Sequence, residues 1–223
     1  MATRNDFHWP RRIFHMLSGA VVVLLSFLFS SRESFLLFLL CFVVFELGLE
    51  IFRLHNHKLN LGITRLFAPL MREGENLRLS GVPYYGFGCF IAYSFFPKPI
   101  AMMAVLYLAV GDPMASIFGR FAKRQGQLNT VFFQKFSTKS LEGSFACFGA
   151  CTLLTYLLWP FSFDGSTSNL WIKLFVSVLG GLSATIGEII PLRTDDNLSM
   201  PLISGALLWL MASLLGIVPG LIN

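Results

Sequence analysis

Charged residues are scarce in this chain. Only 13% of its 223 residues are Asp, Glu, Lys or Arg, whereas 55% are hydrophobic, and the mean hydropathy is +0.67. A soluble domain carries about 25% charged residues, so this composition excludes an ordinary soluble protein. The sequence instead predicts an integral membrane protein.

Cysteine and the common nucleotide-binding motifs are also sparse. The chain has no GxxxxGK[ST], HRD, DFG, HExxH or GxSxG motif, so any nucleotide chemistry must proceed without a P-loop or a protein-kinase frame. No internal repeat divides the chain, and we predict one domain. The cysteines show no C-x-x-C spacing or Cys/His metal pattern, which favours packing roles. These cysteines are Cys41, Cys89, Cys147 and Cys151.

Long apolar runs take the place of charge. A helix needs about 20 mostly apolar residues to cross the hydrocarbon core, and seven segments approach that length. We therefore predict an all-α bundle of about seven membrane-spanning helices, of which the Gly- and Tyr-rich third segment is the weakest. The segments lie at about 13–31, 34–53, 81–97, 99–118, 141–160, 171–190 and 199–219.

Lys and Arg are distributed unevenly among the connecting loops. If the N-terminus is cytosolic, only Arg32, Lys98 and Lys173 of the 17 basic residues fall on the outer side. Basic residues in short loops are retained in the cytosol, so we predict this orientation, with the C-terminus outside. The net charge of +5 then reflects topology beside anionic lipid rather than nucleic-acid binding. A bacterial inner membrane fits best, and an endoplasmic reticulum origin stays open.

Carboxylates inside apolar segments are energetically expensive and tend to mark polar cavities. Glu46, Glu50 and Arg53 share one helix face at the cytosolic end of the second segment. For Glu46 an intramembrane salt bridge is an equally good interpretation. Asp112, the only charged residue between Lys98 and Arg120, follows a glycine and precedes a proline.

The Gly-Asp-Pro step at Asp112 can interrupt helical hydrogen bonding, and irregular backbone within a membrane is tolerated where it lines a cavity. A carboxylate there could bind Mg²⁺, which prefers oxygen ligands. A simple helix end is the alternative. Lys139, Ser140 and Glu142 open the fifth segment, where a helix N-terminus favours phosphate. A capped helix with a snorkelling lysine is the alternative there.

A second acidic cluster lies on the same predicted side of the membrane. It consists of Glu188 and the run Asp195, Asp196 and Asn197. Two groups of carboxylates with several cations suit a magnesium nucleotide and phosphoryl or nucleotidyl transfer. A solvated turn between two helices is the competing interpretation of the Asp195 to Asn197 run.

Together these motifs resemble those of a known family. They look like the CTP-dependent lipid kinases, which include dolichol kinase, phytol kinase and yeast-type diacylglycerol kinase and are distantly similar to CDP-diacylglycerol synthase. The most specific parts are the Gly-Asp-x-x-Ala-x-x-x-Gly-Arg and Lys-Ser-x-Glu-Gly blocks. The full set is Arg12…His15…Gly19, Glu50-x-x-Arg53, Glu75…Leu79-Ser80-Gly81, Gly111-Asp112-x-x-Ala115-x-x-x-Gly119-Arg120, Lys139-Ser140-x-Glu142-Gly143 and Glu188…Asp196-Asn197…Pro201.

The resemblance implies transfer of the γ-phosphoryl group of CTP to the hydroxyl of a lipid alcohol, such as diacylglycerol, a polyprenol or phytol, at the cytosolic face with Mg²⁺. It implies catalytic roles for Asp112, Lys139 and Glu142, with Asp112 as the expected base. The implied nucleotide or phosphate ligands are Arg120, Lys139, Ser140 and Asn197. The implied metal ligands are Asp112, Glu188, Asp195 and Asp196. The implied site mouth consists of Arg12, His15, Glu50 and Arg53.

Two other functions compete with this one. CDP-diacylglycerol synthases share the Asp and Lys-x-x-Glu-Gly blocks, but their signature usually ends in a Lys/Arg-rich stretch running into Lys-Asp. The run from Arg193 to Asn197 looks more like the kinases. A small transporter would also carry ionisable residues within its spans, but usually near the midplane and in repeated halves. An oligomer is possible in each case.

Overall fold

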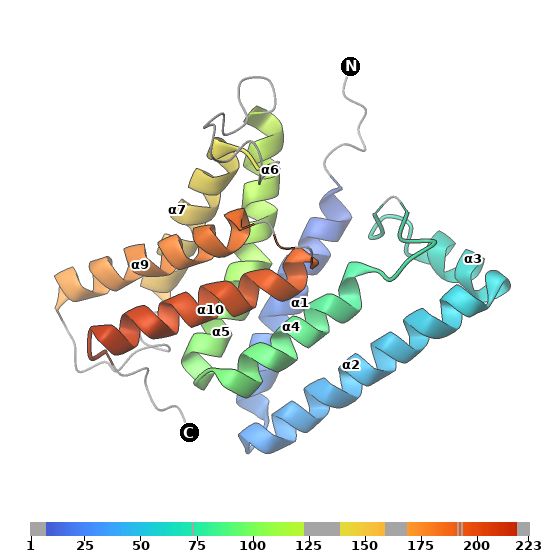
Figure 1. The fold of residues 1–223 in the computed structure, drawn as a ribbon, viewed down its shortest axis with the longest axis horizontal. Helices are drawn as coiled ribbons and strands as arrows, with labels where there is room; N and C mark the ends of the chain where they lie inside the picture. The colour runs from blue at the N-terminus through green and yellow to red at the C-terminus, as the bar shows by residue number, and fades with distance from the viewer. Residues whose placement is uncertain are drawn as a thin grey trace.

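The computed structural model describes residues 8–72, 74–122, 139–158, 169–190, 192 and 194–217. Within these residues the chain is helical and forms no β-strand (Figure 1). The elements are α1 (Trp9–Leu28), α2 (Arg32–His55), α3 (His57–Leu66), α4 (Gly81–Phe95), α5 (Lys98–Leu106), the π-helical turn η1 (Tyr107–Gly111), α6 (Asp112–Ala122), α7 (Leu141–Leu157), α9 (Leu170–Ile189) and α10 (Asp196–Leu214).

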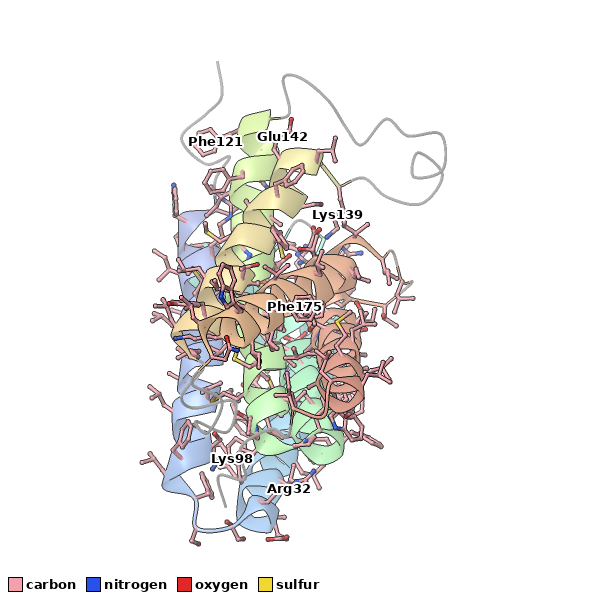
Figure 2. The ribbon with its side chains drawn as sticks, turned by 90° about the vertical axis from the view of Figure 1, so that its left-hand side faces the viewer. Arg32, Lys98, Phe121, Lys139, Glu142 and Phe175 are labelled. Atoms are coloured by element: carbon pink, nitrogen blue, oxygen red, sulfur yellow. The ribbon has the colours of Figure 1, made fainter. Side chains whose placement is uncertain are left out.

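Five helical stretches are long and apolar enough to cross a membrane, which confirms the predicted all-α membrane class. They are Trp9–Leu28, Arg32–His55, Lys98–Phe121, Leu170–Ile189 and Asp196–Leu214. The apolar helix α7 is shorter, and α4 has 15 residues. The count of seven and the cytosolic N-terminus stay predictions, and the predicted ends at 159–160 and 218–219 lie outside the described residues. Figure 2 places Arg32 and Lys98 at the opposite end of the bundle from Lys139 and Glu142.

The continuous stretch from α5 through η1 into α6 is the core of the bundle. Ile100, Met103 and Val105 are fully buried. α5 packs against α1, α4 and α10, and η1 packs against α1, α7, α9 and α10. Because these helices surround it, the stretch holds the following residue, Asp112, in a fixed position.

The Gly-Asp-Pro step does not end this helix. The π-helical turn ends at Gly111, and α6 then continues to Ala122, so the predicted irregularity is a single π turn within a long helix. A Cβ at Gly111 would lie 2.9 Å from the sulfur atoms of Cys147 and Cys151, so glycine is needed for this close approach. Cys147 and Cys151 are both buried and free, and they pack against Gly111, in agreement with the predicted packing role. Single π turns are frequent at functional sites.

The two most specific sequence blocks pack directly against each other. A Cβ at Gly119 of α6 would lie 2.6 Å from Oγ of Ser140, and a Cβ at Gly143 of α7 would lie 2.6 Å from the carbonyl oxygen of Ala115. Small residues therefore let α6 and the start of α7 approach closely. Ser140 also caps α7, because its Oγ accepts a hydrogen bond from the Gly143 N–H at 3.1 Å.

Helices α1 and α2 diverge from their shared turn (Figure 1). Helix α2 packs mainly against α4, whereas α1 packs mainly against α5 and η1. The divergence leaves space between α1, α2 and α4.

Candidate active site

Two cavities of opposite character meet beside α1. The first, here the apolar cavity, has a volume of about 400 Å³ and lies among α1, α2, α3 and α4. The second, here the basic pocket, has a volume of about 350 Å³ and lies between α1, α6 and the segment that carries Met71 and Arg72. Arg11, His15 and Met71 line both cavities, so the two spaces adjoin there.

The basic pocket is built from two helix faces. On α1 the lining residues Arg11, Arg12 and His15 recur with helical spacing, and His8 is added just before the helix. On α6 the lining residues Asp112, Ser116 and Arg120 are four residues apart, and Arg72 is added from a loop. Asp112 is the pocket's only carboxylate among the described lining residues. Guanidinium groups bind phosphate oxygens strongly, so this pocket suits a polyphosphate.

Arg12 is oriented by the opposite wall of the pocket. Its Nη2 donates to Ser116 Oγ at 2.8 Å and to the Ser116 carbonyl oxygen at 3.3 Å, and the residue is buried. These bonds join α1 to α6 across the pocket.

His15 lies beside Asp112 where the cavities adjoin. Its Nε2 is 3.9 Å from Asp112 Oδ2 and 3.2 Å from the carbonyl oxygen of Leu108. Five residues after Leu108 stands Pro113, which has no N–H, so no π-type bond occupies that carbonyl. The Tyr85 ring contacts the imidazole edge to face at 4.8 Å. The partly exposed Asp112 is thus held near an oriented imidazole.

Lys139 connects the second acidic cluster to this site. Its Nζ lies 3.1 Å from Glu188 Oε1 and 3.0 Å from Asp196 Oδ2. Burial opposes the charge on the ammonium, but Glu188, Asp196 and Asp112 outweigh burial and raise the pKa of Lys139 above its usual range. Lys139 is therefore cationic at neutral pH. The charge of Asp112 acts on Lys139, although Asp112 begins α6 and Lys139 lies just before α7.

Glu142 is the least engaged of the predicted catalytic residues. Its Oε2 is buried and has no hydrogen-bond partner among the described residues. It lies in the first turn of α7, near the end of the bundle that Figure 2 labels with Phe121. Its proposed role beside Lys139 stays a prediction.

The polar residues at the start of α10 contact different parts of the molecule. Asp195 Oδ2 accepts from Arg72 Nη1 at 3.1 Å, and Asp195 Oδ1 accepts from the Asn197 N–H at 3.0 Å. The Asn197 amide donates to the Gly81 carbonyl oxygen at 2.9 Å and lines the apolar cavity, not the basic pocket. Both were predicted as nucleotide or metal ligands. In this arrangement they connect α10 to the loop and α4.

Glu50 and Arg53 form a buried bidentate ion pair. Arg53 Nε and Nη2 each donate to a Glu50 oxygen at 2.7 Å. Arg53 also donates to the carbonyl oxygens of Glu75 at 2.9 Å and Arg78 at 3.0 Å, and Glu50 accepts from the Ser80 N–H at 2.7 Å. The pair lies on the wall of the apolar cavity, but its polar atoms hold the loop between α3 and α4 in place.

Glu75 completes that loop. Its Oε2 accepts from the Arg72 N–H at 2.7 Å, its Oε1 accepts from the Gly81 N–H at 3.2 Å, and Arg11 approaches it at 3.7 Å. Sequence reasoning did not identify Arg11 or Arg72 as site residues. The helical spacing between Arg11 and His15 could have identified Arg11. No sequence pattern around Arg72 identifies it, because its position depends on this loop.

Glu46 stands apart from these networks. It is half-buried, lines the apolar cavity and makes no ion pair or hydrogen bond within the described part of the chain. The salt bridge considered for it therefore has no partner among those residues.

The acidic residues suit a metal that arrives with its substrate. No group of three or more His, Cys, Asp or Glu side chains among the described residues is arranged to hold a metal by itself. Instead, Glu188 and Asp196 converge on the Lys139 ammonium, with Asp112 nearby. Mg²⁺ usually takes one or two carboxylates plus substrate phosphates, so these oxygen donors fit it. Magnesium binding stays a prediction.

The chain has clear relatives among known proteins, although no protein-family model and no solved structure matches it. It is 31% identical over 155 residues to CTP-dependent diacylglycerol kinase 1 of Schizosaccharomyces pombe, covering 66% of this chain and 67% of that protein. It is 30% identical over 210 residues to the protein of the same name from Eremothecium gossypii, covering 87% of this chain and 64% of that protein. An uncharacterised Rickettsia prowazekii protein is 30% identical over 202 residues, covering 88% and 91%. The chain therefore belongs to the CTP-dependent diacylglycerol kinase family.

Proposed function

We propose that this protein transfers the γ-phosphoryl group of CTP to the hydroxyl of diacylglycerol at the cytosolic face of the membrane. The observation that carries the proposal is the junction of the two cavities at Arg11, His15 and Met71. An apolar lipid chain suits one cavity and a triphosphate suits the other. Relatives named CTP-dependent diacylglycerol kinase support both the donor and the acceptor.

The basic pocket binds the triphosphate in this mechanism. Phosphoryl transfer depends mostly on positioning and on neutralising the charge of the phosphoryl oxygens. Arg12, Arg72 and Arg120 line the pocket and supply that positive charge. Arg12 is held in position by Ser116, so little reorganisation is needed when the nucleotide binds.

Asp112 is the general base in this mechanism because it lies where the two substrates meet. The lipid hydroxyl gives its proton to the Asp112 carboxylate, and its oxygen forms a bond to the γ-phosphorus. The bond between that phosphorus and the β,γ-bridging oxygen breaks, and CDP leaves with the electron pair. His15 lies beside Asp112, with its Nε2 3.9 Å from Asp112 Oδ2.

Asp112, Glu188 and Asp196 would hold Mg²⁺, which would neutralise phosphate charge during the transfer. Lys139, held between Glu188 and Asp196, places a further cation beside these groups.

The test uses the purified protein in detergent with Mg²⁺ and CTP labelled either on the γ-phosphate or on the base. Diacylglycerol, a polyprenol, phytol and phosphatidic acid are offered separately. Diacylglycerol that gains only the γ-label supports the proposal. Label in another alcohol would change the acceptor, base label in lipid would indicate a cytidylyltransferase, and no transfer from CTP or ATP would remove the kinase function.

A further inference from the structure

The apolar cavity follows α1 for most of that helix. Its lining residues on α1 run from Arg11 to Leu25, a rise of about 21 Å at ~1.5 Å per residue. The hydrocarbon core is about 30 Å thick, so this length exceeds that of one leaflet. The cavity begins at Arg11 and His15, where it adjoins the basic pocket, and becomes wholly apolar toward Leu25.

An aromatic cluster closes the far end of the cavity. Leu25 of α1 and Phe38 of α2 are the lining residues nearest the turn that joins these helices. The Phe38 ring lies 5.2 Å from the ring of Phe29 and 6.4 Å from that of Phe35. Phe35 is in turn packed edge to face on Tyr93 at 4.9 Å, and both are buried. Of Phe29, Phe35 and Phe38, here the aromatic floor, only Phe38 lines the cavity. It is 38% exposed, and its ring packs against the other two.

The side of the cavity is open between α1 and α2. Phe14 and Val21 on α1 and Phe42 on α2 all line the cavity, yet their exposed fractions are 46%, 51% and 41%. In a membrane, side chains that are exposed along two spanning helices face lipid. A lipid chain can therefore pass sideways from the bilayer into the cavity without leaving apolar surroundings.

From this shape we infer that the aromatic floor sets the length of the acyl chain that the acceptor lipid can bury. The inference rests on the proposed function, because the reacting hydroxyl must lie near His15 and Asp112. A glycerolipid chain placed from that point reaches toward Phe38 and is then stopped. A chain too long for this distance must leave through the open side and loses apolar contact. The acceptor class is thus an acylglycerol whose chain fits the distance from His15 to Phe38 along the cavity.

The experiment compares dioctanoyl-, dipalmitoyl- and diarachidoylglycerol as acceptors in mixed micelles with CTP. Phe38→Ala removes the ring at the far end of the cavity and so deepens it. Leu25→Trp places a larger side chain at that end and so makes the cavity shallower. Phe45→Ala is the matched control, because Phe45 lies on the same helix but is 61% exposed and does not line the cavity. The readouts are kcat/KM for each acceptor and the KM for CTP.

The wild type and the Phe45→Ala variant should prefer dipalmitoylglycerol. Phe38→Ala should shift the kcat/KM ratio toward diarachidoylglycerol by about tenfold, and Leu25→Trp should shift it toward dioctanoylglycerol by a similar factor, with the KM for CTP unchanged. If Phe38→Ala fails to fold, Leu25→Trp alone tests the inference, because its larger side chain fills part of the cavity and leaves no new void. Identical chain-length profiles in wild type and variants would overturn the inference and leave the kinase intact. Failure of the wild type to phosphorylate any diacylglycerol would instead refute the proposed function.

Discussion

The apolar cavity and the basic pocket share α1 and Met71 but differ in their other walls and in their chemical character. On α1, Arg11, Arg12 and His15 face the basic pocket, and Ser18 to Leu25 continue along the apolar cavity. The remaining walls come from α2 and α4 on one side and from α6 on the other. A charged and an apolar substrate can therefore bind independently and still place their reacting groups within one turn of α1. Separate defects in the two cavities should have separate kinetic signatures.

Asp112→Asn should have the largest effect on activity, because Asp112 lies where the two substrates meet and takes part in the reaction itself. We expect kcat for lipid phosphorylation to fall by about 10² to 10⁴, with the KM for diacylglycerol little changed. Initial rates across both substrate concentrations test this. Glu33→Gln, an exposed carboxylate in the first turn of α2, is the control. A fully active Asp112→Asn variant would remove Asp112 from the chemistry.

Arg53→Ala should damage both cavities together, because Arg53 fixes the loop that contributes Met71 and Arg72. Removing one partner of a buried ion pair destabilises a protein by about 3–5 kcal/mol. Arg53 is 1% exposed, and its loss leaves Glu50 with only the Ser80 N–H from the loop. Thermal unfolding measured with a thiol-reactive dye in a Cys41→Ser background reports the exposure of the three buried cysteines. An unchanged melting temperature would contradict this structural role.

Local sequence patterns predicted the helical class and suggested several of the candidate site residues. Helix class follows from composition and run length. Asp112, Arg120, Lys139 and Glu188 were candidates because each belongs to a short motif within or next to an apolar segment. The structure then brings Lys139 to Glu188 and Asp196 through the packing of α7, α9 and α10. That packing depends on small residues spread over three helices, so the sequence could suggest the group but not its pairing.

The remainder depends on contacts between distant parts of the chain. Arg72 reaches Asp195 across 123 residues, and the loop that carries it is held by Glu50 and Arg53 from α2. Sequence spacing predicted that Glu50 and Arg53 lie together but gave no information on the loop carbonyls that Arg53 binds. The apolar cavity could not be predicted either, because it lies between two helices whose relative arrangement their sequences do not specify.

Arg120→Ala should affect only the basic pocket. Loss of a hydrogen bond to a charged group amounts to about 1.5–3 kcal/mol, so we expect the KM for CTP to rise about tenfold to a hundredfold. The KM for diacylglycerol should stay unchanged. Arg120→Lys should restore part of the effect, since it keeps the charge but not the forked geometry. Equal increases in both KM values would contradict the separation of the two cavities.

Ser18→Phe should affect only the apolar cavity, with a smaller change. Ser18 lines that cavity, whereas the neighbouring Leu17 is 58% exposed and does not. A bulky ring at Ser18 should raise the KM for diacylglycerol roughly tenfold, without changing the KM for CTP. Leu17→Phe is the matched control on the same helix. If both variants behave alike, the acceptor does not occupy the apolar cavity.

Glu46→Gln should have the smallest effect. Glu46 and Glu50 are one turn apart on α2 and both line the apolar cavity, but only Glu50 has ion-pair and hydrogen-bond partners in the described structure. Glu50→Gln leaves the buried Arg53 without its counter-charge, whereas Glu46→Gln leaves no partner unpaired. We therefore expect a marked loss of thermal stability for Glu50→Gln and a change within about 0.5 kcal/mol for Glu46→Gln. Initial rates with diacylglycerol complete the comparison. A Glu46→Gln variant of normal stability that no longer binds diacylglycerol would show that this carboxyl contacts the acceptor, and the apolar cavity would then recognise a polar group as well as a chain.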